Sequence, residues 1–174
     1  MFFVQMAGFP GSGKSTLSRE IAKRTGAVII DHNVVKSALL HSTEDFPLEG
    51  KRAGQIAYSI DWSLIEFHLS QGHNVIFDSP CLYEEMVERG IGLSERYHAN
   101  YKYVECYLND FEEVNERLKK RDPMISQIKE VRSEEVFQSS LVHSKKPTDH
   151  SYMVVDTSRP LGSYVNEVLT YINE

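Results

Sequence analysis

The chain has 174 residues, enough for one domain that buries a core without disulfides or a structural metal. Its 41% hydrophobic and 25% charged residues are close to the averages of globular proteins, which argues against disorder and collagen-like repeats. The net charge of -6 argues against wholesale neutralisation of a nucleic-acid backbone, although it leaves room for a local basic groove.

Neither the cysteines nor the apolar runs point to secretion or to a membrane. Cys81 and Cys106 lack metal-ligand spacing and are too few for a disulfide framework, so we expect a reducing compartment. The first seven residues have no basic lead-in, and no apolar run reaches the roughly 18 residues of a membrane span. A cytoplasmic protein with no membrane partner is therefore expected.

Strand-like and helical patterns alternate along the chain. Buried β-branched runs predict strands at residues 2–7, 27–30, 75–77, 101–108 and 152–155. Apolar residues at helical spacing predict helices at 14–24, from about 33, and at 51–71, 83–97, 111–121, 133–142 and 161–172. Gly26 and Gly72 are expected to end the first and third of these helices.

This alternation predicts an α/β, three-layer sandwich around a five-stranded parallel sheet with right-handed crossovers. No repeat or linker interrupts the chain, so residues 1–174 are expected to form a single domain. Sheets of this kind bind ligands at the carboxyl ends of their strands.

A phosphate-binding loop follows the first strand. Gly8, Gly13, Lys14 and Ser15 satisfy the pattern G-x-x-x-x-G-K-[ST], and the next residues open a helix. Glycines let successive backbone N–H groups point into one concavity, and the helix N-terminus adds partial positive charge. Lys14 would reach the β- and γ-phosphates and Ser15 would bind magnesium. The residues expected to contact ATP are Gly8, Gly11, Ser12, Gly13, Lys14, Ser15 and Thr16.

Two other nucleotide-binding classes are disfavoured. The dinucleotide-binding glycine loop requires a third glycine where this chain has Thr16. GTPases carry an Asn-Lys-x-Asp motif that reads the base, and the chain has none.

Carboxylates stand at the ends of two predicted strands. Asp78 ends the third strand, where a carboxylate would hold magnesium, although it could instead form an Asx-turn before Pro80. Asp31 ends the second strand and could accept the proton of a substrate hydroxyl or help to hold the metal. It could equally cap the following helix. His32 is expected to be a surface turn residue.

Arg117 and Arg121 are four residues apart and are expected to share one face of a helix that Asp122 and Pro123 break. A lid-like segment at about 117–133 could bring these guanidinium groups over the γ-phosphate, where they would stabilise developing charge. The alternative is a solvated helix face paired with Glu113 and Glu116.

Three stretches together carry a family resemblance: residues 8–16, Asp31-x-Asn33-x-x-Lys36, and residues 75–80. The chain resembles the P-loop kinase-like ATP-binding proteins grouped with polynucleotide 5′-hydroxyl kinases, zeta toxins, and gluconate and shikimate kinases. The resemblance implies a nucleoside-monophosphate-kinase-like core with strand order 2-3-1-4-5, and ATP with Mg²⁺ as cofactors. In relatives the second stretch often reads Asp-x-Asp-x-x-Arg, with carboxylates serving magnesium and acceptor activation.

Asn33 and Lys36 depart from that pattern. An amide cannot take a proton from a hydroxyl at neutral pH, so the base role would pass to Asp31 or be absent. We therefore expect an ATP:hydroxyl phosphotransferase with a small-molecule acceptor, and as alternatives a nucleotide-binding regulatory protein or a polynucleotide 5′-hydroxyl kinase.

Overall fold

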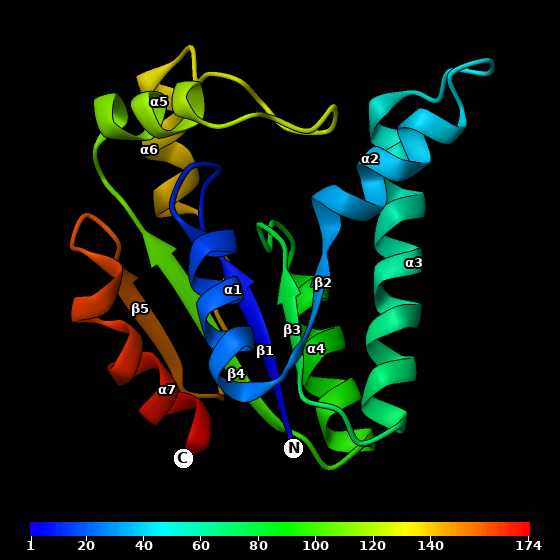
Figure 1. The fold of residues 1–174 in the computed structure, drawn as a ribbon, viewed down its shortest axis with the longest axis vertical. Helices are drawn as coiled ribbons and strands as arrows, with labels where there is room; N and C mark the ends of the chain where they lie inside the picture. Colours follow the sequence, from blue (N-terminus) through cyan, green and yellow to red (C-terminus); the bar gives the residue numbers. More distant parts are fainter.

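The computed structural model describes residues 1–174, which form a five-stranded parallel sheet in the order β2-β3-β1-β4-β5 (Figure 1). The strands are β1 (Phe2–Ala7), β2 (Val28–Asp31), β3 (Val75–Asp78), β4 (Asn100–Tyr107) and β5 (Tyr152–Asp156). The central position of β1 explains its burial along its whole length, because it is hydrogen-bonded to β3 on one side and β4 on the other. The predicted fold class and strand order are confirmed.

Helices cover both faces of the sheet. One face carries α1 (Lys14–Thr25) and α7 (Val165–Asn173), which pack on Phe2, Val4 and Met6 of β1. The other face carries α3 (Gly50–Ser70) and α4 (Glu84–Arg96), whose apolar side chains pack with Phe3 and Ala7. Alternate residues of one strand thus belong to two cores, as the period of a strand requires.

The remaining helices lie beyond the carboxyl ends of the strands (Figure 1). They are α2 (His32–Ser42), which packs against the upper part of α3, and the pair α5 (Phe111–Lys120) and α6 (Glu134–Val142). A third core holds α5 and α6 together; it contains Leu108, Val114, Leu118 and Phe137. The segment between α5 and α6 extends toward α2, so both groups of helices border the edge where ligands are expected.

Helix ends agree closely with the glycine signals. Gly26 adopts φ 72° and its N–H donates to the carbonyl of Ala22, which ends α1. Gly72 adopts φ 78° just beyond α3. No helix is both long and apolar enough to cross a membrane.

Two predicted helix boundaries are wrong. The expected continuous helix over residues 161–172 is divided into a 3₁₀ turn, η1 (Leu161–Ser163), and α7, with Tyr164 between them. The helix α5 ends at Lys120, and Arg121 is extended with ψ 154°. Arg117 and Arg121 therefore do not share a helix face, because the residues before Pro123 are turned out of helical geometry.

Candidate nucleotide and acceptor site

The loop between β1 and α1 has the backbone that its glycines permit. Gly8, Gly11 and Gly13 have φ values of 128°, 88° and 91°, a region that side chains disfavour. The N–H of Ser12 donates to the carbonyl of Phe9 at 3.0 Å, which closes the turn. The loop thus leads directly into the N-terminus of α1 at Lys14, as expected.

The loop is packed on both sides. A Cβ at Gly8 would lie 2.3 Å from the carbonyl oxygen of Cys106 on β4, so the two backbones touch. On the other side the Phe9 ring meets Phe137 of α6 edge to face, with centroids 5.1 Å apart. The shape of the loop therefore depends on β4 and α6 as well as on its own sequence.

Thr157, just after β5, fastens the loop to the sheet. Its hydroxyl lies 2.7 Å from the carbonyl of Ser12 and 3.0 Å from that of Tyr107, so one O–H is shared by two acceptors. Its own N–H donates to Tyr107, and the side chain is buried. Sequence reasoning assigned Thr157 no role.

Replacing Thr157 with valine, which has nearly the same shape, should lower the free energy of unfolding by about 1–2 kcal/mol, because the buried carbonyl of Ser12 loses its donor. Urea unfolding measures the loss, and Thr157→Ser, which keeps a hydroxyl, is the control. If the valine variant were as stable as the native chain, the hydroxyl would not fasten the loop.

Lys14 is buried and lies against the loop. Its ammonium donates to the carbonyls of Gly8 at 2.7 Å and Phe9 at 3.1 Å. Burial lowers the pKa of Lys14, and the negative charge of Asp78 opposes that shift. A desolvated ammonium beside a loop whose backbone N–H groups form an anion-binding concavity suits a phosphate ligand.

Asp78 ends β3 and is 2% exposed. Burial raises its pKa, while the positive charge of Lys14 and a hydrogen bond from Ser15 oppose the rise. A desolvated carboxylate beside a hydroxyl is an all-oxygen pair of the kind that Mg²⁺ accepts, and a cation there would relieve the cost of the buried charge. Ser15 and Asp78 therefore fit the magnesium site expected of them.

A cleft of about 1220 Å³ runs from the loop to α2 and α3. Although the chain has a net charge of -6, the cleft is lined by eight cationic side chains and one carboxylate, Asp122. The cationic residues are Lys14, Arg19, Lys36, Lys51, Arg117, Lys120, Arg121 and Arg159. This concentration of positive charge favours a polyanionic ligand.

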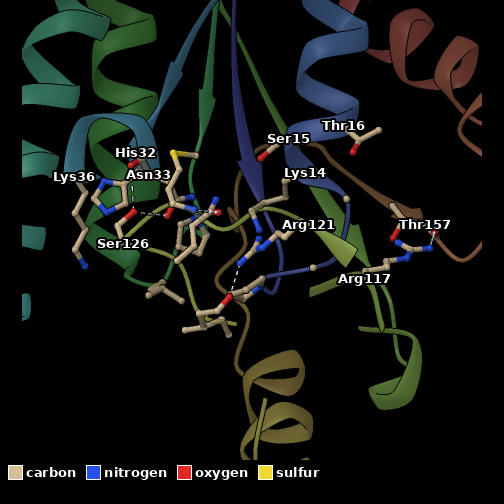
Figure 2. A pocket seen from close by; sticks show the side chains of 18 of the residues that line it. Lys14, Ser15, Thr16, His32, Asn33, Lys36, Arg117, Arg121, Ser126 and Thr157 are labelled. Atoms are coloured by element: carbon tan, nitrogen blue, oxygen red, sulfur yellow. Dashed lines mark hydrogen bonds between the residues drawn. The ribbon is translucent and has the colours of Figure 1, made fainter. Parts of the chain in front are cut away.

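Both predicted arginines line the cleft, at different places (Figure 2). Arg117 forms an ion pair with Glu113 and donates to the carbonyl of Thr157 at 2.8 Å. Arg121 donates to the carbonyl of Ile128 at 2.6 Å, and its buried Nε has no partner. Arg121 lies close enough to Lys14 for its charge to lower the pKa of that residue.

Asp31 lies at the N-terminus of α2, beside Asp78 in the sheet register. Its Oδ1 accepts from the N–H groups of Asn33 at 2.9 Å and Val34 at 3.4 Å, so the carboxylate caps α2. Asp31 does not line the cleft, whereas the next two residues do.

His32 is not the surface turn residue that the sequence suggested. It is the first residue of α2, 6% exposed, and its Nδ1 lies 2.7 Å from Oδ2 of the buried Asp61 on α3. Its ring stacks on Tyr58 with centroids 3.9 Å apart. The prediction failed because the partner is 29 residues away, on a helix that packs against α2.

The sequence did hold a signal for this pair. Asp61 follows Ala57 and precedes Ile65 at four-residue spacing on the buried face of α3. A carboxylate at a core position requires a buried partner, and the partner is His32. Ser126 of the lid-like segment was also missed; its hydroxyl contacts Ser37 at 2.8 Å and the carbonyl of Asn33 at 3.1 Å, so the segment touches α2.

Solved structures with this fold cover nearly the whole chain at low identity. A sugar kinase from Janibacter sp. HTCC2649 has a TM-score of 0.68 at 18% identity, over 99% of this chain and 95% of that one. A gluconokinase from Sinorhizobium meliloti 1021 has 0.63 at 20%, over 99% and 91%. Kti12 from Chaetomium thermophilum, solved with ADP-AlF3, has 0.65 at 14%, over 98% of each.

A search among curated protein sequences found no match. A family model described as an AAA domain matches residues 3–142, a span that contains the glycine-rich loop, Asp78 and the segment between α5 and α6. The chain therefore belongs to this AAA-domain family and is a P-loop kinase-like protein.

Proposed function

We propose that this chain is an ATP- and Mg²⁺-dependent kinase that transfers the γ-phosphate to a hydroxyl of a small-molecule acceptor. The observation that carries the proposal is the cationic cleft, which joins the phosphate loop to α2 and α3 in a protein of net negative charge. Its volume of about 1220 Å³ is larger than the roughly 300–1,000 Å³ of a single ligand pocket and has room for a nucleotide and a small second substrate. The similar sugar kinase and gluconokinase support this class of acceptor.

In the proposal the loop binds the triphosphate and α1 orients it. Backbone N–H groups of Gly11, Ser12 and Gly13 face the phosphates, with Thr16 beside them at the start of the helix. Lys14 exchanges its contacts with the loop carbonyls for the β- and γ-phosphates. Ser15 and Asp78 would hold Mg²⁺, which would neutralise part of the negative charge of the triphosphate.

The arginines serve the charge that develops during transfer. Arg121 lines the cleft and makes a single side-chain hydrogen bond, to a carbonyl of its own segment, so its guanidinium group is available to a ligand. Arg117 is held by Glu113 and Thr157 and borders the loop, where a Cβ at Gly13 would lie 3.8 Å from its Nη1. Closure of residues 117–133 would bring Arg121 over the γ-phosphate.

Arg121→Ala should lower kcat by about 10- to 100-fold and leave the Kd of ATP within about threefold, because the contact is made mainly in the transition state. The matched control is Arg132→Ala, since Arg132 is exposed in the same segment and pairs only with Glu130. If kcat were the same in Arg121→Ala and Arg132→Ala, Arg121 would have no part in the transfer step.

Asp31 keeps a part in the proposal through its charge. Its negative charge raises the pKa of both Lys14 and Asp78, and it pairs with Asp78 in the register of β2 and β3. The capping bonds to α2 occupy Oδ1 and leave Oδ2 without a hydrogen bond, although Asp31 lies outside the lining of the cleft.

The test is transfer of labelled γ-phosphate from ATP·Mg²⁺ to a panel of nucleosides, sugars including gluconate, small alcohols and 5′-hydroxyl oligonucleotides. We expect a phosphorylated product with a small acceptor. Transfer confined to oligonucleotides would instead identify a polynucleotide kinase, and its binding should then be strongly salt-dependent. ATP binding with no transfer to any acceptor would contradict the kinase proposal.

A nucleotide-binding regulatory protein is the second candidate, and Asn33 favours it. The amide stands where relatives often carry a carboxylate, and its Oδ1 faces the hydroxyl of Ser126 at 3.5 Å. Asn33→Asp separates the candidates. A clear gain of transfer would indicate an enzyme weakened at this position, whereas unchanged transfer would mean that residue 33 is not the base.

A further inference from the structure

A buried histidine and carboxylate lie beside the part of the cleft that borders α2 and α3, and the proposed function does not use them. His32 opens α2 and Asp61 lies in the middle of α3, with side chains 7% and 0% exposed. Their Nδ1 and Oδ2 atoms are 2.7 Å apart. When Asp61 is ionised its carboxylate can only accept a hydrogen bond, and the proton of this contact is then on Nδ1 of His32.

The ring of His32 is held on a second side. Tyr58, three residues before Asp61 on the same face of α3, stacks on the imidazole at 3.9 Å with an interplanar angle of 13°. The ring therefore has little freedom to rotate. Its remaining nitrogen, Nε2, points away from Asp61 and has no hydrogen-bond partner in the protein, and His32 lines the cleft together with Asn33 and Pro80.

Burying this pair costs desolvation free energy that a contact serving only to join two helices would not need. Asp61 is fully buried, and its Oδ1 has no hydrogen-bond partner. Burial raises the pKa of Asp61, and the hydrogen bond and charge of His32 oppose the rise. Apolar residues at both positions would join α2 to α3 without this desolvation cost. A partly satisfied polar pair at the wall of a ligand cleft is typical of a functional site.

We propose that Nε2 of His32 is the base that takes the proton of the acceptor hydroxyl, with Asp61 as the residue that positions it. This inference rests on the proposed kinase function. The acceptor oxygen forms a bond to the γ-phosphorus while its proton passes to Nε2. The bond from that phosphorus to the β–γ bridging oxygen breaks, and its electron pair leaves with ADP. The imidazolium is stabilised by Asp61 until the proton passes to solvent.

The geometry favours His32 over its neighbour Asp31. Oδ1 of Asp31 already accepts two N–H groups of α2, and Asp31 does not line the cleft. His32 lines it and has a nitrogen without a partner. The same step accounts for Asn33, because a base supplied by His32 makes a carboxylate at position 33 unnecessary.

The test compares His32→Asn, Asp61→Asn and Asp31→Asn. The asparagine at position 32 can still donate to Asp61 from the place of Nδ1 but has nothing at Nε2. His41→Asn is the matched control, because His41 lies on the same helix as His32 and forms an exposed pair with Glu44, which follows the helix, at 2.9 Å. Acceptor probes are gluconate, glucose, glycerol, adenosine and a 5′-hydroxyl oligonucleotide, and release of inorganic phosphate reports water as acceptor.

His32→Asn should lower kcat by about 10- to 100-fold with an unchanged Kd for ATP, a modest effect because phosphoryl transfer depends mostly on positioning. Asp61→Asn should lower kcat as well, and His41→Asn should not. Nitrogen-15 spectra of the native protein should show a proton on Nδ1 and none on Nε2 of His32, with that preference lost in Asp61→Asn.

A proton found on Nε2 in the native protein would overturn the inference whatever the variants do. An unchanged kcat in His32→Asn would overturn this inference and leave the kinase proposal standing. A loss of kcat confined to Asp31→Asn would return the base role to Asp31. If the native protein bound ATP but transferred to no probe and released no phosphate, the kinase proposal itself would fall and this inference with it.

Discussion

Replacing Lys14 with alanine is expected to weaken ATP·Mg²⁺ binding by about 100-fold or more. The ammonium is the only cation that is both buried at the loop and opposite Asp78. Removing one partner of a desolvated charge contact costs about 2–5 kcal/mol, and each 1.4 kcal/mol is about tenfold in affinity. Isothermal titration calorimetry measures the change.

Lys23→Ala is the control for that variant. Lys23 lies on the last turn of the same helix, is exposed, and does not line the cleft. The Kd of Lys23→Ala for ATP should stay within about threefold of the native value. Circular dichroism must show that Lys14→Ala is folded. A folded Lys14→Ala with native affinity would mean that the triphosphate does not bind at this loop.

Gly8→Ala is expected to lower the free energy of unfolding by about 3 kcal/mol or more and to weaken ATP binding. At φ 128° a side chain is strained by about 1–3 kcal/mol, and the added Cβ would lie 2.3 Å from the carbonyl oxygen of Cys106. The loop must therefore move away from β4. The midpoint of urea unfolding should fall without a change in slope.

Gly26→Ala separates the two causes. Gly26 has φ 72°, but a Cβ there meets no atom within 4 Å, so only the backbone strain of about 1 kcal/mol applies. If Gly8→Ala cost no more than Gly26→Ala, the close approach of the loop to β4 would not matter for stability.

Local patterns were enough to predict most of the fold. The β-branched runs and the glycines after α1 and α3 gave every strand and most helices, because burial and backbone conformation act over a few residues. The strand order came from the family resemblance. Leu161 and Val165 are four positions apart, a spacing that fits one continuous helix as well as a 3₁₀ turn followed by a helix. The break at Tyr164 was therefore not predicted.

The candidate site was predictable only where its chemistry lies within one segment. The phosphate loop is such a segment, and the structure shows its predicted strand–turn–helix context. The capping by Asp31 was anticipated as one of two alternatives. The contacts of His32 with Asp61 and of Thr157 with Ser12 join residues 29 and 145 positions apart, so no local pattern contains them.

The charge distribution also required the structure. A net charge of -6 describes the whole chain, whereas the cleft gathers cations from α1, α2, α3, α5 and the loop after β5. The net charge did not exclude a local basic groove, and the structure contains one. It leads from the phosphate loop toward His32 and Lys36.

The most direct test of the account is the thermal unfolding of the native chain with ATP and Mg²⁺. At 100 times its dissociation constant the ligand should add about 2.7 kcal/mol to the stability, with a smaller gain when Mg²⁺ is removed. A native protein whose unfolding is unmoved by ATP, GTP and their diphosphates would contradict the assignment of the loop as a nucleotide site, and with it the kinase proposal.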